Sequence, residues 1–259
     1  ARAYARLRPA KDIIKRVILL GPCHRVAVKG LALSSAKAFA TPLGNIELDQ
    51  DAIDQIKNLP QVSVFDQTHR EEHSLEVHLP FLQIMLGKFK LIPLVVGDCD
   101  PQDIVQVIDT LWGGAETLIV ISTDLSHFLD YDQAVEIDTR TCKAIEAMDI
   151  NSIEGNQACG RVPLKGFLKS AKKRGMSVET LGLNNSGDTA GTKDRVVGYG
   201  SWAFHEVDGL MVEEPKQDFE QQTRDLLKDH GELLLKISAA SIVNGLNKAK
   251  AVGIDMNSF

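Results

Sequence analysis

The feature that most constrains the fold of this chain is a set of short, continuous aliphatic runs. They stand in segments 16–22, 90–98 and 116–123 as ILL, LVV and LIVI, without alternating polar residues. Strands that are covered on both faces have this pattern, and such strands are typical of parallel sheets. Segments with apolar residues at helical spacing lie between the runs. Strands that alternate with helices predict an α/β fold with a mostly parallel central sheet flanked by helices.

Further elements follow from the same patterns. Additional strands are expected over 28–34, 61–66, 177–185 and 195–204. Helices are expected over 49–59, 101–114, 131–148 and 162–175, with start and stop signals such as Pro163 and Gly175 at the ends of the last one. Thr68 and Glu71 have the spacing of a capping box, which predicts that another helix begins at Thr68 and buries a stripe of leucines.

Composition narrows the class of protein. A chain of 259 residues with 44% hydrophobic and 25% charged residues is typical of a globular protein with one large domain, or one domain and an appendage. The net charge is −6 and there is no long basic block, which argues against nucleic acid or an anionic membrane surface as a partner. No stretch approaches the roughly 20 apolar residues of a membrane span, and no secretory signal is visible.

The cysteines indicate a compartment. Cys23, Cys99, Cys142 and Cys159 are far apart and form no C-x-x-C pair. This pattern does not fit a disulfide scaffold or a zinc ribbon, so we expect reduced thiols in a cytoplasmic protein.

The character of the sequence changes after Val207. Residues 1–207 carry the α/β pattern, residues 208–216 form a polar linker with Gly and Pro, and residues 217–259 contain helical patterns too short to close a core. We interpret this tail as the start of a second domain, or as a helix that docks on the first. The chain opens without Met on a helical pattern, which predicts a missing upstream segment, with a processed terminus as the alternative.

Polar residues gather where the expected core strands end. Cys23 and His24 follow the first strand, and a segment with Asp124 and His127 follows the strand at 116–123. Ligands of parallel α/β sheets bind outside the carboxyl ends of the strands, so the two histidines indicate one shared crevice. A capping or core-edge role for each histidine is the alternative.

The segment HREEH offers another site. On the helix predicted from Thr68, His69 and His73 share one face, whereas His78 lies about 140° around from His73 and is expected to be a solvated surface residue. HREEH also matches the inverted zinc-protease pattern, in which His69 and His73 would hold zinc and Glu72 would serve as the base.

Cys159 precedes the helix expected near Pro163. The helix dipole and the neighbouring Arg161 would favour its thiolate, which is a nucleophile or a soft metal ligand. A buried small hydrophobe is the alternative, and it is our interpretation of Cys142, which lies in an amphipathic helix.

Four separated motifs, in order, resemble the Memo family, whose bacterial and archaeal members are called AmmeMemoRadiSam system protein B. The motifs are GPCH, EEHSLEVHLPFLQ, STDLSHF and CGRVPL, and the resemblance covers about residues 1–207. That family looks related to the LigB-like class III extradiol dioxygenases, which use non-haem iron. The tail DHGELLLKISAASIVNGL resembles the opening of an AMMECR-type domain, which implies such a domain and a radical SAM enzyme as partners.

The resemblance implies roles for single residues. His24 matches a metal-ligand histidine, and Cys159 matches the cysteine that stands where the dioxygenases have a carboxylate ligand. His127 matches the acid/base histidine, Asp124 belongs to the same pocket, and His73 looks like a histidine beside a ligand or the substrate. The family's first ligand histidine lies in a His-Ala-Gly motif upstream of this chain, so two of three ligands are expected here, and the chain alone is expected to bind metal weakly or not at all.

Three functions follow. The first is a metal-dependent redox enzyme of dioxygenase ancestry, with Fe(II) or copper as its cofactor and a small molecule or peptide in its pocket. A thiolate ligand makes the site softer, which favours copper or zinc over the iron of an ordinary facial triad. The second is a binding module that uses the inherited pocket for a peptide or protein without catalysis. The third is the inverted zinc protease. The substrate and the role of Cys23 are left open.

Overall fold

The computed structural model describes residues 2–189, 191–206, 221, 224–225 and 227–230. The predicted linker 208–216 lies outside the described residues, as does the expected AMMECR-like segment 217–259 apart from the few tail residues just given. Residues 227–230 are helical, as expected. Within the described part of the chain, no helix has both the length and the apolar character needed to cross a membrane.

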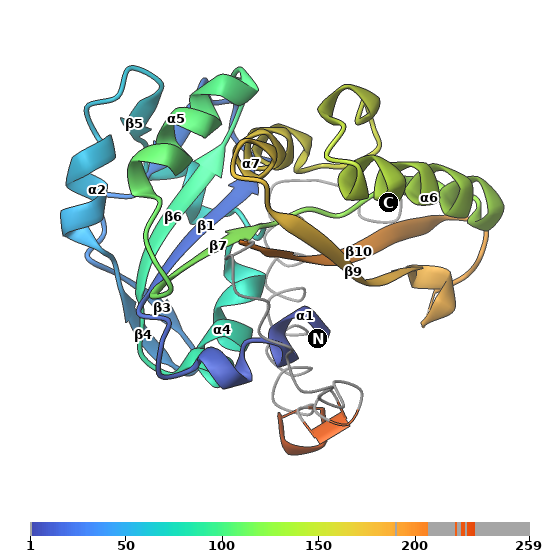
Figure 1. Cartoon of the computed structure of the whole chain (residues 1–259), viewed down its shortest axis with the longest axis horizontal. Coiled ribbons are helices and arrows are strands. Elements are labelled where there is room, and N and C mark those ends of the chain that lie inside the picture. Colours follow the sequence, from blue (N-terminus) through green and yellow to red (C-terminus); the bar gives the residue numbers. More distant parts are fainter. Residues whose placement is uncertain (1, 190, 207–220, 222–223, 226, 231–259) are drawn as a thin grey trace, which may run out of the picture.

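The core is a five-stranded, mostly parallel sheet, which confirms the predicted fold class. Its strand order is β5 (Val62–Val64), β2 (Leu31–Leu33), β6 (Lys90–Val96), β1 (Arg16–Pro22) and β7 (Thr117–Ile121). β1 pairs in parallel with both β6 and β7, while β2 runs antiparallel to β6. The aliphatic runs form the three parallel strands in the middle and at one edge of the sheet (Figure 1).

The continuous runs are apolar because both faces of these strands are covered. Residues 17–20 of β1 are fully buried, and all residues of β6 after Lys90 are buried. Each fully buried aliphatic side chain contributes about 1.5–3 kcal/mol. The sheet therefore forms a rigid floor whose strand ends hold the residues that follow them.

Helices cover the sheet and begin where the sequence supplies a cap. α5 (Pro101–Leu111) begins with a capping box at Asp100 and packs against α2 (Gln50–Ile56) and α7 (Arg161–Lys173). α7 also packs on β1 and β7 (Figure 1). The remaining described helices and 3-10 turns are α1 (Arg2–Ala5), η1 (Arg8–Ala10), α3 (Gln67–Arg70), η2 (Glu76–His78), α4 (Leu79–Leu86), α6 (Tyr131–Glu146), η3 (Ile150–Ser152) and η4 (Ser186–Asp188).

A second sheet, which the sequence did not separate from the first, lies beside it. Its strands are β8 (His127–Leu129), β10 (Val196–His205) and β9 (Ser177–Asn185), and all neighbours are antiparallel. α6 packs on it (Figure 1). The short strand β8 was not predicted, nor was the hairpin of β3 (Ala38–Thr41) and β4 (Gly44–Glu47), because three or four residues carry little periodic signal.

The helix predicted from Thr68 is wrong. α3 begins at Gln67 and ends at Arg70, and the Thr68 hydroxyl donates to the Phe65 carbonyl and caps nothing. Beyond α3 the Glu72 carboxylate accepts the backbone N–H groups of His73 and Ser74, which a continuing helix would direct at residues 69 and 70. The helix is therefore interrupted, and helical structure returns only at η2 and α4.

His78 is also placed differently from the expectation. It is a half-buried residue whose Nδ1 is hydrogen-bonded to the hydroxyl of Tyr4, and it is not a solvated surface residue. Burial lowers the pKa of His78 to about 4, so the ring is neutral near pH 7.

Candidate metal centre

The residues that follow two core strands lie at one edge of the sheet, as predicted. β1 ends at Pro22 and is followed by Cys23 and His24, while β7 ends at Ile121 and is followed by the segment that carries Asp124. Because β1 and β7 are parallel neighbours, their carboxyl ends lie at the same edge of the sheet. The start of α7 brings Cys159 to this edge.

Gly160 allows that close approach. A Cβ atom at this position would lie 2.3 Å from the Ser122 carbonyl oxygen, so a larger residue would push α7 away from the end of β7. The Gly160 N–H donates to Thr123 Oγ1 at 2.9 Å. Glycine at position 160 therefore allows the start of α7 to pack directly against the end of β7.

The Cys159 sulfur is held by backbone groups. Its Sγ accepts the Asp124 N–H at 3.1 Å, and the Cys159 N–H donates to the Asp124 carbonyl at 3.2 Å. Cys159 lies two residues before Arg161, the first residue of α7, where the positive end of the helix dipole favours negative charge. The Cys159 sulfur is therefore held at a defined position just before α7.

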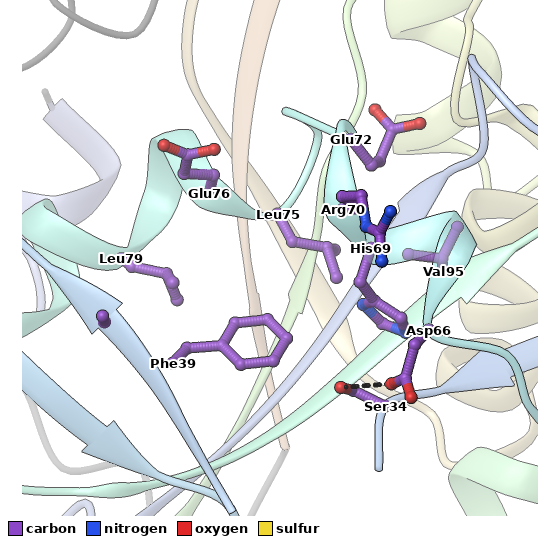
Figure 2. A pocket seen from close by; sticks show the side chains of 11 residues that line it. Ser34, Phe39, Asp66, His69, Arg70, Glu72, Leu75, Glu76, Leu79 and Val95 are labelled. Carbon is purple, nitrogen blue, oxygen red and sulfur yellow. Dashed lines mark hydrogen bonds between the residues drawn. The ribbon is translucent and has the colours of Figure 1, made fainter. Parts of the chain in front are cut away.

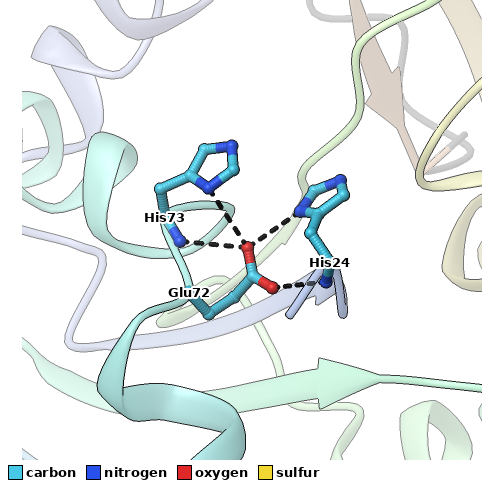
Figure 3. Close-up of side chains that lie close together, drawn as sticks. All are labelled: His24, Glu72 and His73. Carbon is cyan, nitrogen blue, oxygen red and sulfur yellow. Dashed lines mark hydrogen bonds and ion pairs between the residues drawn. The ribbon is translucent and has the colours of Figure 1, made fainter. Parts of the chain in front are cut away.

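The buried carboxylate of Glu72 binds His24 and His73. The Glu72 side chain is 1% exposed, and its Oε2 accepts the His24 backbone N–H at 2.5 Å. Its Oε1 lies 2.8 Å from His24 Nδ1 and 3.5 Å from His73 Nδ1 (Figure 3). Burial raises the pKa of Glu72, but the hydrogen bonds from His24 and Ser74 outweigh it and lower the pKa to about 2. Glu72 is therefore an anion.

His24 and His73 form a matched pair around this anion. Their rings are stacked, with centroids 5.0 Å apart and 19° between the planes. Both rings direct Nδ1 at Glu72 and Nε2 away from it (Figure 3). The interaction of His24 with Cys159, followed by its hydrogen bond to Glu72, raises the pKa of His24 to about 10. Burial lowers the pKa of His73.

Asp124 and His127 lie close to Cys159. Asp124 Oδ2 is 3.9 Å from His127 Nε2, and ligand atoms of these two residues and Cys159 all lie within 4.8 Å of one another. Burial raises the pKa of Asp124, while the charges of the nearby His127, His73 and His24 oppose this shift. The structure thus brings together all five residues singled out in the sequence.

Asp138 binds the backbone next to His127, and no motif in the sequence pointed to this residue. This carboxylate of α6 is 3% exposed, and its Oδ1 accepts the Ser126 N–H at 3.0 Å. Gly198 of β10 lies against its other oxygen, because a Cβ there would come within 1.8 Å of Oδ2. An acidic residue among apolar neighbours of an amphipathic helix was the only available hint.

The zinc-protease arrangement is not formed. His69 is turned to the Ala32 carbonyl, with Nε2 at 3.1 Å from the oxygen, and it shares no metal-ligating group with His73 among the described residues. The interruption after α3 separates the two imidazoles, which needed a continuous helix to share one face.

The other cysteines lie outside the ligand groups found in the described chain. The Cys23 thiol donates to the Val26 carbonyl at 2.7 Å. Burial raises the pKa of Cys99 to about 12, so its thiol is neutral. Cys142 is buried in α6, in agreement with a structural role.

The donor set suits a borderline or soft divalent metal. His24 and His73 each direct Nδ1 at a carboxylate, which is the usual arrangement of metal-bound histidine. The Cys159 thiol lies within hydrogen-bonding reach of the His24 ring. Imidazole and thiolate ligands suit zinc, copper and iron better than magnesium or calcium.

Comparisons with known proteins agree with the motifs. A family model described as "Memo-like protein" matches residues 1–203. A "MEMO1 family protein" of Aquifex aeolicus is 33% identical over 199 residues, which is 73% of this chain and 74% of that protein. One of Methanosarcina mazei is 33% identical over 212 residues, or 77% of each chain, and one of Sulfolobus acidocaldarius is 30% identical over 201 residues, or 73% of this chain and 71% of that protein.

Proposed function

The chain belongs to the Memo family, and from this premise we propose that it is a metal-dependent redox protein that holds iron or copper between His24, His73 and Cys159. The proposal rests above all on the Glu72 carboxylate, whose Oε1 faces Nδ1 of both histidines. A carboxylate that holds two imidazoles in one orientation is a costly buried charge, and metal ligation by the Nε2 atoms of the two rings would give it a purpose.

The proposed ligands are His24 Nε2, His73 Nε2 and Cys159 Sγ. This assignment moves His73 from a place beside the metal onto the metal. It takes its three ligands from two neighbouring ligand groups of the described chain, which meet at His24 and Cys159. The Cys159 sulfur, with its backbone N–H donor from Asp124, would make the site softer than a two-histidine, one-carboxylate triad.

His127 and Asp124 are the proposed catalytic residues. A redox metal bound at the site would supply electron transfer and Lewis acidity to the substrate. His127 Nε2 lies 3.9 Å from the Asp124 carboxylate, so the imidazole can carry a proton while the carboxylate orients it. Asp138 keeps this imidazole in place through the backbone of Ser126. The pocket in front of the two side chains would take a small molecule or a peptide.

A binding module without catalysis is the second candidate. One observation favours it: the His73 side chain is 57% exposed and that of Asp124 is 49% exposed, so the site is open to water. An open pocket suits a peptide or protein partner better than chemistry that needs water excluded. An AMMECR-type domain and a radical SAM enzyme are partners that we propose for either candidate, in the cytoplasm.

Oxygen consumption separates the two candidates. Protein loaded anaerobically with Fe(II), or with Cu(I), is mixed with oxygen and a panel of reducing small molecules, beside His127→Ala. The redox proposal predicts turnover that requires the metal and falls by about 10²–10⁴-fold in His127→Ala, since that is the usual contribution of a general acid or base. Metal binding without turnover, equal in the two proteins, would support the binding module.

A further inference from the structure

A cavity lies beside the segment that carries Glu72. It has a volume of about 350 Å³ and is bounded by β3, β6, α3 and the turn that precedes α4 (Figure 2). This volume falls at the small end of the range found for ligand pockets, roughly 300–1,000 Å³. Of the residues of the proposed metal centre the cavity shares Glu72, whose carboxylate is already bound to His24, His73 and Ser74.

The floor of the cavity is apolar and rigid. Leu75, Leu79 and Val95 are almost fully buried, and the ring of Phe39 forms one wall. The Phe39 ring also meets the His69 imidazole edge-on, with centroids 5.8 Å apart, which fixes the orientation of that wall. Such a floor favours an aliphatic or aromatic group of a ligand.

Most polar groups around the floor are already satisfied. The Asp66 carboxylate accepts hydrogen bonds from Ser34 Oγ at 2.9 Å and from Ser35 N at 2.8 Å. The His69 Nε2 is bound to the Ala32 carbonyl, whereas the His69 Nδ1 is buried without a hydrogen-bond partner. The Asp66 carboxylate thus has little left to offer a ligand, and the His69 Nδ1 is one polar atom of the lining that a ligand could still reach.

Arg70 and Glu76 differ from their neighbours. Both line the cavity, and within the described part of the chain neither side chain makes a hydrogen bond or an ion pair, not even with the other. Figure 2 places them at separate points of the wall, with Leu75 between them. One cationic and one anionic side chain without side-chain partners therefore border the apolar lining of the cavity.

We propose that this cavity binds a compact zwitterion with an apolar side chain, of the kind of an α-amino acid. The ligand carboxylate pairs with the Arg70 guanidinium, whose planar fork suits bidentate binding, and the ligand ammonium pairs with Glu76. The apolar side chain lies on Phe39 and Leu79. A simple anion is disfavoured because Asp66, Glu72 and Glu76 surround the cavity, and a simple amine leaves Arg70 without a partner.

Calorimetric titration with L-leucine and two truncated analogues tests this proposal on the full chain. The analogue 3-methylbutylamine lacks the carboxylate, and 4-methylpentanoate lacks the ammonium group. L-Leucine is expected to bind at least roughly tenfold more tightly than either analogue, since a hydrogen-bonded charged group contributes about 1.5–3 kcal/mol. Arg70→Gln and Glu76→Gln should each weaken L-leucine binding about tenfold, whereas Glu71→Gln, a neighbour outside the cavity, should leave it unchanged.

Three results would overturn the proposal. They are the absence of L-leucine binding at millimolar concentrations, equal binding of either analogue, and unchanged binding in both cavity variants. Arg70 and Glu76 are exposed, so the variants are expected to fold, and their thermal unfolding curves check this. Their metal content should equal that of the unaltered protein, so failure of this proposal is distinguishable from failure of the proposed metal site.

Discussion

Glu72 Oε1 lies 2.8 Å from His24 Nδ1, and the other oxygen of the same carboxylate accepts the His24 backbone N–H at 2.5 Å. One buried side chain therefore fixes both the ring and the backbone of His24, which lies two residues beyond the end of the central strand β1. The contact is long-range, because Glu72 and His24 are 48 positions apart in the sequence. It is the contact on which the candidate metal centre depends.

Replacement of Glu72 by Gln tests the role of this contact. The amide keeps the volume but loses the charge and part of the hydrogen bonding, so the two imidazoles lose their common orientation. Loss of such an outer carboxylate usually lowers metal affinity about 10–100-fold, and we expect the same here. A competition titration against a chromogenic chelator measures it. Glu71→Gln, one residue away and exposed, is the control and should change nothing.

Replacement of His69 by Ala separates the metal centre from the inverted zinc-protease pattern. We expect unchanged metal affinity, because His69 faces the Ala32 carbonyl and not the ligand group of His73. Stability should fall by about 1–3 kcal/mol, since a buried acceptor loses its donor. His73→Ala, measured in parallel, should lose metal. A metal deficit in His69→Ala at unchanged His24 and His73 would restore the protease hypothesis.

The lowered pKa of His78 predicts how the stability of the protein changes with pH. Its pKa is about 4 in the folded protein, below the ordinary value of 6.5, because it is buried against Tyr4. Below pH 6.5 the unfolded chain binds a proton at this site that the folded protein does not, so stability falls as the pH drops from about 6.5 toward 4. Urea unfolding across this range measures the slope.

His78→Gln should remove that part of the slope and keep a hydrogen-bonding partner for Tyr4. His205→Gln is the matched control, since the side chain of His205 is 49% exposed. An identical slope in the unaltered protein and in His78→Gln would show that other groups cause the pH dependence.

Substitution of Gly198 tests how tightly β10 packs against Asp138 of α6. A methyl group at this position would meet Asp138 Oδ2 at 1.8 Å, so Gly198→Ala must displace either β10 or α6. We expect a loss of about 1–3 kcal/mol, the usual cost of overpacking, measured by urea unfolding. Gly114→Ala meets only the side chain of Glu116 and should cost much less. Equal costs for the two variants would mean that the Asp138 contact is not tight.

Much of the fold could be predicted because local sequence patterns indicate most of its helices and strands. The aliphatic runs of β1, β6 and β7 need no partner to be recognised, and the positions that follow parallel strands meet at one edge. That rule placed His24 and Asp124 near each other, and the motif around Cys159 brought in the third element. The separate antiparallel sheet was not visible, since strand pairing depends on contacts between distant residues.

The structural role of Glu72 could not be predicted for the same reason. The sequence offered it only as the base of a metalloprotease helix, and helical spacing made His69 and His73 neighbours. The carboxylate instead turns inward to His24, takes the N–H groups of His73 and Ser74, and ends the helix. A buried charge with a distant partner overrides local helix propensity, and periodicity carries no sign of it.

The measurement that tests the metal site most directly is the metal content of protein purified without oxygen, by elemental analysis, beside His24→Ala and Cys159→Ala. Cys142→Ala, a buried cysteine away from the site, is the control. The account predicts close to one equivalent of iron or copper in the unaltered protein and in Cys142→Ala, with loss of metal in the other two. Full metal content in His24→Ala and Cys159→Ala, or no metal in any of the four proteins even after loading, would contradict it.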